Sequence, residues 1–157
     1  NPAKPMPSDA NSTMRMSYGT IKGYSPADAV EYDYFTTSRG ILEKNNPTST
    51  EFNVFPSFLE LVKKGDWGRW ADKKYGKLHV AFISTNDITG GNSGSPVFDK
   101  NGRVFGLAFD GNWEAMSGDI EFEPNLQRTI IVDIRYVLFT IDKWGKCSRL
   151  IDEMTIK

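Results

Sequence analysis

The stretch TGGNSGSP, residues 89–96, decides how this chain is interpreted. Gly90, Gly91 and Gly94 surround Ser93, and glycine accepts backbone conformations that other residues avoid. A tight loop with so little side-chain bulk can aim two backbone N–H groups at one point beside a serine hydroxyl. We assign these donors to Gly91 and Ser93. The alternative is a plain Gly/Asn/Ser-rich turn between strands, which the same residue types favour.

The segments on either side of this loop have the pattern of β-strands. Residues 78–84 form a mostly apolar run that leads toward the loop. Two further apolar runs, 97–98 and 104–109, flank residues 99–102, whose Asn-Gly pair is a strong hairpin signal. Residues 128–134 are rich in β-branched side chains and predict another strand. The loop therefore lies between strands of a sheet.

The N-terminal half continues the strand-rich pattern and adds one helix. Residues 14–21 alternate roughly by two, as a half-buried strand does, and residues 23–26 predict a turn. Residues 31–37 predict a second strand. The segment 45–50 breaks the pattern. Residues 56–64 then predict a short helix with proline at its start and lysines near its end.

The two ends of the chain differ in character. Residues 1–11 are rich in Pro and Asn and predict an irregular lead-in, whereas residues 135–154 predict a C-terminal helical segment. Many short strands, Gly-rich turns and a terminal helix predict a mainly β fold, a six-stranded barrel with one short internal helix and a C-terminal helix. The chain opens on Asn1 and Pro2 without a start methionine, so we expect sequence upstream of it.

Composition excludes several classes of function. A length of 157 residues predicts one domain, and 39% hydrophobic residues suffice for a core. The net charge of −1 argues against a nucleic-acid surface or an anionic-membrane surface. The sequence contains no run of about 18 apolar residues, so it predicts no membrane-spanning helix. The single cysteine, Cys147, rules out an internal disulfide, and with one histidine the chain disfavours a zinc site. We predict no metal and no cofactor.

Longer motifs carry a family resemblance. TGGNSGSPVF (89–98), FGLAFDGNWEAMSGD (105–119) and RTIIVDIRYVLFTIDKW (128–144) resemble the bacterial dipeptidyl-peptidase family with chymotrypsin-like double barrels, as do SYGTIKGY (17–24) and DYFTTSRG (33–40). The resemblance implies serine exopeptidases that release dipeptides from free N-termini of oligopeptides. It also implies a periplasmic or cell-surface location in Gram-negative bacteria and homodimers of the full enzyme. This chain would be the C-terminal barrel, without the first barrel and the inserted helical domain.

The resemblance also assigns roles to single residues. Ser93 becomes the nucleophile, with Gly91 and Ser93 as oxyanion donors. Asp110 matches the carboxylate that holds the ammonium of the substrate; next to glycine, its other interpretation is a turn-capping aspartate. Gly111 matches the wall of the specificity pocket, where family members with arginine accept Asp or Glu. Glycine there implies a hydrophobic penultimate residue, although simple turn chemistry also explains it.

Two neighbouring apolar residues complete the predicted substrate site. Phe109 precedes the aspartate that would hold the ammonium, and Ile88, five residues before Ser93, is a candidate apolar wall of the same pocket. Of the four tryptophans, Trp113 is the one near this site, and we expect it to pack in the core.

A complete enzyme of this kind needs a histidine base and an orienting carboxylate. The one histidine, His79, lies on a predicted strand that does not present the base in this fold, so we interpret it as structural. The base and the carboxylate would come from the absent first barrel, and the isolated chain is expected to be inactive. Asn92 stands where animal digestive proteases carry an aspartate that pairs with a new N-terminus on activation, an ion pair that asparagine cannot form.

Two other interpretations stay open. A glutamyl endopeptidase can share the Gly-Asn-Ser-Gly-Ser-Pro loop, but it carries its histidine in the same compact protein. A non-catalytic barrel that acts as an interaction module is the other. We also expect exposed apolar surface where the missing barrel would pack.

Overall fold

The computed structural model describes residues 14–118 and 120–157, so the predicted irregular lead-in at 1–11 lies outside the described residues. The contacts divide the chain into two units, each discontinuous in sequence. Unit 1 consists of Asn1–Tyr34 and Phe82–Ile131, and unit 2 of Phe35–Ala81 and Val132–Lys157. The predicted nucleophile loop and its substrate residues belong to unit 1, whereas His79 belongs to unit 2.

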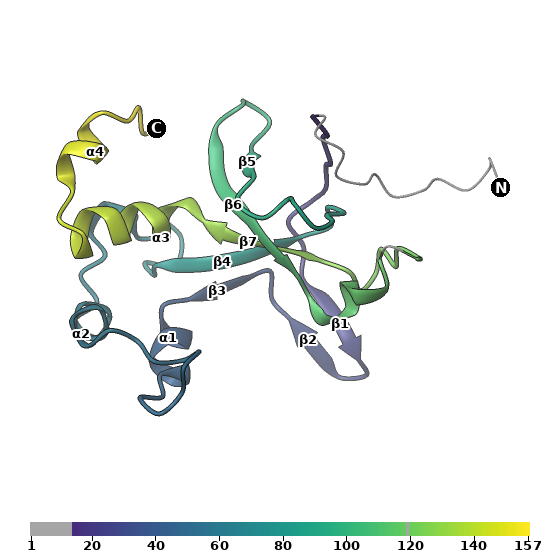
Figure 1. Cartoon of the computed structure of the whole chain (residues 1–157), viewed down its shortest axis with the longest axis horizontal. Helices are drawn as coiled ribbons and strands as arrows, with labels where there is room; N and C mark the ends of the chain where they lie inside the picture. Colours follow the sequence, from purple (N-terminus) through teal and green to yellow (C-terminus); the bar gives the residue numbers. More distant parts are fainter. Residues whose placement is uncertain (1–13, 119) are drawn as a thin grey trace. The chain divides into compact units, whose positions relative to one another are not determined.

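The described residues form seven strands in two sheets, which confirms the mainly β fold class (Figure 1). A closed six-stranded barrel stays a prediction. The two-stranded sheet pairs β1 (Tyr24–Ala27) with β2 (Val30–Tyr32). The larger sheet has the order β3-β4-β7-β6-β5, and β4 and β7 run through both units. Its strands are β3 (Phe35–Thr37), β4 (His79–Ser84), β7 (Thr129–Asp133), β6 (Val104–Gly111) and β5 (Pro96–Phe98).

The predicted hairpin after the nucleophile loop is confirmed. β5 and β6 are antiparallel with a bulge near Phe98 (Figure 1). The Oδ1 atom of Asp99 accepts the N–H groups of Asn101 at 2.8 Å and Arg103 at 3.0 Å, and Gly102 takes a φ of 75°. Because the turn is closed by its own side chains, it fixes β6 beside the strand that follows the loop.

Unit 2 carries most of the helices and the main apolar core. The helix predicted over 56–64 is α2 (Pro56–Lys64), and Gly65 ends it with a φ of 70°. The C-terminal helical region consists of α3 (Ile134–Phe139), the π-helical turn η3 (Thr140–Trp144) and α4 (Ser148–Asp152). Two short helices were not predicted, α1 (Arg39–Lys44) and η1 (Gly68–Trp70). The buried core of this unit comprises Phe58, Val62, Trp70, Leu78, Leu138, Phe139 and Ile151.

Three predictions near the N-terminus are wrong. Most of the predicted turn at 23–26 lies in β1, because Tyr24 and Ala27 pair with Tyr32 and Val30 of β2. The predicted strand at 31–37 is two strands separated at Asp33, whose Oδ1 accepts the N–H of Tyr34 at 2.7 Å. Residues 14–21 do not form a half-buried strand: Ile21 makes an isolated bridge to Ser84, and the residues before it have no regular secondary structure and are mostly exposed.

Unit 1 is completed by η2 (Trp113–Ser117), a 3-10 turn that follows β6 directly. Asn112 anchors the start of this turn: its Nδ2 donates to the carbonyl of Leu126 at 2.8 Å, and its Oδ1 accepts the N–H of Arg128 at 2.7 Å. The Nδ2 atom also donates to Glu114 at 2.8 Å, and the hydroxyl of Tyr24 donates to the same carboxylate oxygen at 3.0 Å. η2 is thereby tied to the start of β7 and to β1.

Candidate active site

The loop 89–96 is closed by the side chain of Asn92. Its Oδ1 accepts the N–H of Thr89 at 3.0 Å, and its own N–H donates to the carbonyl of Thr89 at 3.2 Å. Its carbonyl accepts the N–H of Ser95 at 3.0 Å. Gly91 and Gly94 take φ values of 95° and 85°, in the region that favours glycine, so the two flanking glycines are required by the path of the backbone.

The loop is also fastened to β6. The N–H of Gly94 donates to the carbonyl of Ala108 at 2.7 Å, and the N–H of Ala108 donates to the carbonyl of Ser95 at 2.8 Å. These bonds place Ser93 next to the end of β6. Its hydroxyl donates to the carbonyl of Phe109 at 3.2 Å, and the residue is exposed. The predicted nucleophile therefore faces solvent beside the strand that carries the predicted substrate residues.

The N–H groups of the loop fall into two sets. Those of Asn92, Gly94 and Ser95 donate to backbone carbonyls. Within the part of the chain that the structure describes, the N–H groups of Gly90, Gly91 and Ser93 donate to none. Gly91 and Ser93, the two residues assigned from the sequence as oxyanion donors, belong to this second set. The arrangement is compatible with that assignment, which stays a prediction.

A cavity of about 470 Å³ opens at this loop within unit 1. It brings together four of the predicted site residues, Ser93, Asp110, Gly111 and Ile88, all of which line it. Phe109 and Gly91 are not part of its lining, although the carbonyl of Phe109 contacts Ser93 and its side chain is exposed. Four of the six site residues predicted from the sequence therefore line one cavity.

The chemistry of this cavity is mixed. Trp113, Ala115, Met116 and Phe122 supply apolar lining, while Asn86, Asp87, Thr89, Asn112, Gln127 and Thr129 supply polar lining. Gln127 is buried, and its amide Nε2 donates to the carbonyl of Glu121 at 3.1 Å. A methyl group added at Gly111 would lie 3.0 Å from the Cβ of Ala115, so the two chain segments meet closely there.

Trp113 corrects one of the predictions. It was expected in the core, yet 83% of its surface is exposed, and Met116 beside it is 76% exposed. Both belong to η2, which projects from the end of β6 and leaves their side chains at the cavity. Sequence reasoning missed Met116 and misplaced Trp113, because a tryptophan next to a glycine-containing turn carries no signal of which way a 3-10 turn will face.

Arg128, which also lines the cavity, holds several backbone segments together. It is buried, and its guanidinium donates to five carbonyl oxygens at 2.7–3.2 Å, those of Lys22, Gly23, Pro124, Asn125 and Gln127. Burial lowers the pKa of this guanidinium from its usual value. Nothing in the sequence distinguished Arg128 from a surface arginine. Its hydrogen bonds fix the backbone at the start of β7.

His79 has a different environment, in unit 2. It is buried, its ring stacks on Phe35 with 4.1 Å between ring centroids, and its Nδ1 lies 3.2 Å from Nη2 of Arg135. The same guanidinium binds Asp133 and Asp72, each at 2.6 Å. Both carboxylates raise the pKa of Arg135, and in return Arg135 lowers the pKa of Asp72 to about 2. This packing is that of a structural histidine.

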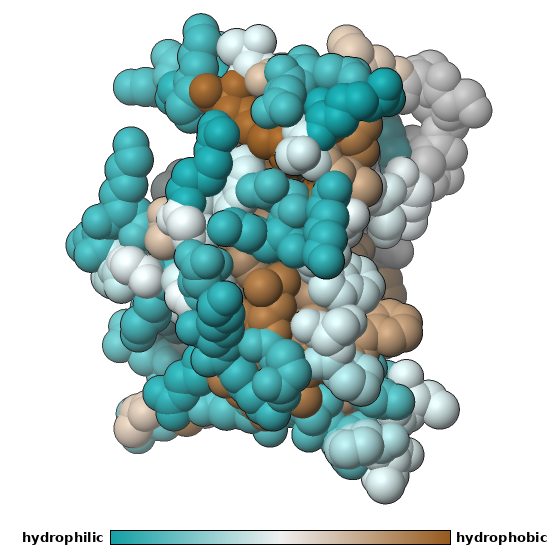
Figure 2. All heavy atoms as spheres, turned by 90° about the vertical axis from the view of Figure 1, so that its left-hand side faces the viewer, coloured by the Kyte–Doolittle hydropathy of each residue, from teal (hydrophilic) through white to brown (hydrophobic). Residues whose placement is uncertain are grey.

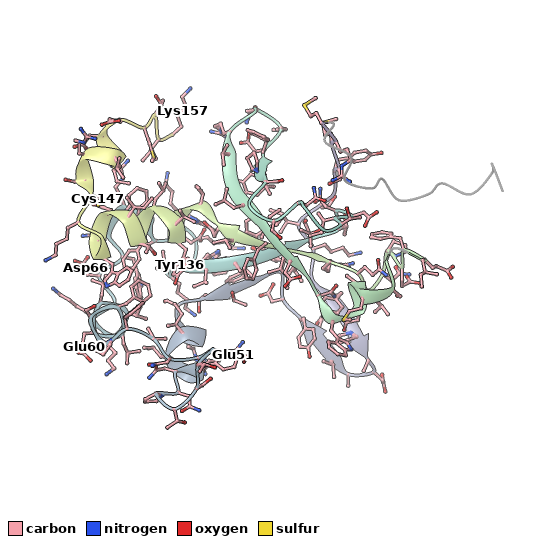
Figure 3. All side chains as sticks on the ribbon, in the orientation of Figure 1. Glu51, Glu60, Asp66, Tyr136, Cys147 and Lys157 are labelled. Atoms are coloured by element: carbon pink, nitrogen blue, oxygen red, sulfur yellow. The ribbon has the colours of Figure 1, made fainter. Side chains whose placement is uncertain are left out.

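Unit 2 has a larger cavity of its own, of about 790 Å³. Its lining mixes aromatic and aliphatic side chains of α1, α2 and α3 with charged and polar residues of α1 and of the loop between α1 and α2. Glu51 and Tyr136, labelled in Figure 3, are among the lining residues. Burial raises the pKa of Tyr136. On the face of the molecule that carries these helices, apolar atoms reach the surface between polar side chains (Figure 2). The cavity contains no serine, cysteine or histidine in its lining.

Comparison with known proteins places this arrangement in a family. The Peptidase S46 family profile matches residues 1–156. The chain belongs to the peptidase S46 family. It is 66% identical to Dipeptidyl-peptidase 7 of Porphyromonas gingivalis over 99% of its own length, and 53% identical over 94% to the Asp/Glu-specific dipeptidyl-peptidase of the same organism.

The S46 fold is supported by solved structures as well. A crystal structure of Porphyromonas endodontalis DPP11 in complex with the dipeptide Arg-Asp matches with a TM-score of 0.86 and 48% identity, over 90% of this chain and 20% of that one. The chain spans about a fifth of the length of these relatives: 22% of the first and 20% of the second. Among the described residues, no helix is long and apolar enough to cross a membrane.

Proposed function

We propose that this chain is the nucleophile-bearing part of a serine-type dipeptidyl peptidase, an exopeptidase that releases dipeptides from free N-termini. The observation that carries the proposal is the cavity of unit 1, in which Ser93, Asp110, Gly111 and Ile88 share one surface. Membership of the S46 family, whose relatives include dipeptidyl peptidases, gives the reaction class.

Ser93 attacks the carbonyl carbon of the second residue of the substrate. A base removes the hydroxyl proton, and the resulting oxyanion receives hydrogen bonds from the N–H groups of Gly91 and Ser93. The base then protonates the departing amine, leaving the dipeptide esterified to Ser93. Water hydrolyses this ester and frees the dipeptide. In the chain alone, the hydroxyl of Ser93 donates to the carbonyl of Phe109 instead of a base.

Asp110 binds the ammonium group of the substrate. Its Oδ1 accepts the N–H of Gly111 at 2.8 Å, and among the described residues no hydrogen bond engages its Oδ2. A carboxylate oxygen at the cavity that contains the nucleophile is a suitable partner for a primary ammonium. With the ammonium held at Asp110 and the attacked carbonyl at Ser93, the spacing between these two residues would limit cleavage to the second peptide bond of the substrate.

Gly111 itself adds no charge to the pocket. We infer a hydrophobic penultimate residue, held by Ile88, with the exposed phenyl ring of Phe109 as a second apolar contact. Polar residues also line the cavity, so discrimination among uncharged side chains is expected to be broad. One relative bears the name Asp/Glu-specific dipeptidyl-peptidase, which indicates acidic residues for that protein.

The remaining catalytic groups lie outside this chain. The one histidine of the sequence is packed in unit 2 against Phe35 and Arg135, so the base and its carboxylate come from a first barrel elsewhere in a longer protein. The chain itself, residues 1–157, is then the C-terminal barrel and inactive alone. We further propose a homodimeric parent that acts in the periplasm or at the cell surface.

A serine-directed fluorophosphonate probe tests this function. We expect Ser93 to be labelled in the complete protein and not in the 157-residue chain, and we expect Ser93→Ala to abolish labelling. Hydrolysis of dipeptidyl amides with a free amine, but not of the same substrates with a blocked amine, tests the exopeptidase assignment. Labelling at another serine, or equal cleavage of blocked substrates, would refute it.

A further inference from the structure

The segment 14–20, which we call the N-terminal arm, has two unlike faces. Met14, Met16 and Tyr18 are 97%, 87% and 89% exposed. Arg15, between the two methionines, is half-buried, and its Nη1 lies 3.4 Å from Oγ1 of Thr89. The three large apolar side chains face solvent, whereas Arg15, Ser17 and Thr20 make contacts with the protein.

The inner face of the arm is fixed to the segment that leads into the nucleophile loop. Thr20 and Thr85 exchange two hydrogen bonds, of 2.9 and 3.0 Å, and Nδ2 of Asn86 lies 3.5 Å from the hydroxyl of Ser17. At Gly19 a Cβ atom would lie 2.6 Å from the backbone nitrogen of Asn86. Only glycine permits this approach, so the arm is seated against residues 84–89 along its length.

An ordered segment with a fully exposed apolar face needs a cover. Exposing three large apolar side chains that lie close together to water is unfavourable, and such a group of exposed apolar side chains marks an interaction surface. The arm is not a free tail, because its backbone and polar side chains are bonded to unit 1. The inner contacts therefore fix the position of the arm, and the described residues leave its outer face uncovered.

We propose that the face formed by Met14, Met16 and Tyr18 is covered by the part of the longer polypeptide that supplies the catalytic base to Ser93. This inference rests on the proposed function, in which Ser93 is the nucleophile. That base cannot be His79, which is packed in unit 2, and the chain spans about a fifth of the length of its relatives. The base-bearing part must therefore reach the nucleophile loop from outside these 157 residues.

The arm lies where this part must arrive. Its inner face contacts Thr89, whose N–H is bonded to Asn92 in the loop, one residue before Ser93. A body that brings a base to Ser93 approaches the same loop, and the uncovered apolar face beside it is the surface on which it can rest. The contact between Arg15 and Thr89 then couples docking on the arm to the position of the loop.

Photo-crosslinking in the complete protein tests this surface without reference to catalysis. A benzophenone amino acid is placed at Met16, with a matched probe at Lys100 in the exposed hairpin turn. We expect the Met16 probe to join a peptide from outside residues 1–157 at the mass of one polypeptide, and the Lys100 probe to join none. A product of twice that mass would instead assign the face to a second copy. That product, or no product at Met16, would overturn the proposal.

Peroxide oxidation provides an independent measure. In the folded complete protein, Met14 and Met16 should oxidise at least about tenfold more slowly than in the urea-unfolded protein, because a covered thioether is shielded. Equal rates would overturn the proposal. Met16→Asp should lower kcat/KM by about tenfold, whereas Val104→Asp, on the exposed hairpin, should change it less than twofold. If Ser93→Ala retains activity, the proposed function fails while the crosslinking result still stands.

Discussion

Replacement of Arg135 by methionine should destabilise unit 2 more than any single change at its surface. Arg135 binds Asp133 through two hydrogen bonds, Nε to Oδ1 at 2.9 Å and Nη2 to Oδ2 at 2.6 Å, and binds Asp72 through Nη1 at 2.6 Å. Methionine keeps the aliphatic stem and removes the charge, so packing is disturbed little. The variant isolates the loss of the guanidinium.

The magnitude follows from burial. The side chain of Asp133 is 6% exposed and that of Asp72 19% exposed, so the variant leaves one buried and one largely buried carboxylate without their cation. Breaking a buried pair in this way costs about 3–5 kcal/mol. Because the arginine side chain itself is 32% exposed, solvent relieves part of the penalty, and we expect a loss of about 2–3 kcal/mol.

Urea unfolding monitored by tryptophan fluorescence measures the effect, since Trp70 is buried in the same unit. Arg135→Lys should recover less than half of the loss, because a lysine cannot engage both carboxylates with the same geometry. In a double-mutant cycle, Asp72→Asn should cost about 1–2 kcal/mol alone and much less in the Arg135→Met background. A loss under 1 kcal/mol for Arg135→Met, or additive effects in the cycle, would refute this account of the cluster.

Three further predictions concern pH, specificity and packing. The pKa of Asp72 is about 2, below its usual 3.8, so its ion pair contributes about 2 kcal/mol to the free energy of unfolding above pH 4, and this contribution should vanish as the pH falls toward 2. The unfolding free energies of wild type and Asp72→Asn, measured against pH, should therefore converge near pH 2, and parallel curves would contradict this. In the complete protein, Gly111→Arg should shift the ratio of kcat/KM values at least about tenfold toward acidic penultimate residues, measured on paired Leu and Glu substrates. An unchanged ratio would show that Gly111 does not determine specificity. Trp70→Phe should cost about 2 kcal/mol in urea unfolding, because the indole N–H bonds Asp142 at 2.8 Å and the ring is 2% exposed, and a cost below 0.5 kcal/mol would show that the bond contributes little.

The features that sequence predicted well are those encoded by a few adjacent residues. The Asn-Gly turn at 101–102 specifies the hairpin by its own backbone preferences, and the helix over 56–64 has a proline at its start and a glycine at its stop. The gathering of Ser93, Asp110 and Gly111 on one cavity came from the family resemblance, because nothing in residue spacing tells how β6 passes behind the loop.

Sequence failed where long-range pairing decides the structure. The alternation at 14–21 is genuine, but it does not say which face the protein covers, and here the apolar face is the uncovered one. Strands β2 and β3 were joined into one because Asp33, which interrupts them, stands among strand-forming aromatic residues. The clustering of Arg135 with Asp72, 63 residues earlier, and the carbonyl cage around Arg128 leave no local signal at all.

The closure of the nucleophile loop by Asn92 bears on how such an enzyme could be controlled. The amide bonds Thr89, three residues away, and no distant partner takes part in that bond. Asn92 therefore closes the turn from within the loop, while the bonds of Gly94 and Ser95 to Ala108 hold the loop against β6, and none of these bonds uses a liberated chain end. The activity of such a protein would be controlled by whether the general base reaches Ser93, because the nucleophile loop already has its shape before the base arrives.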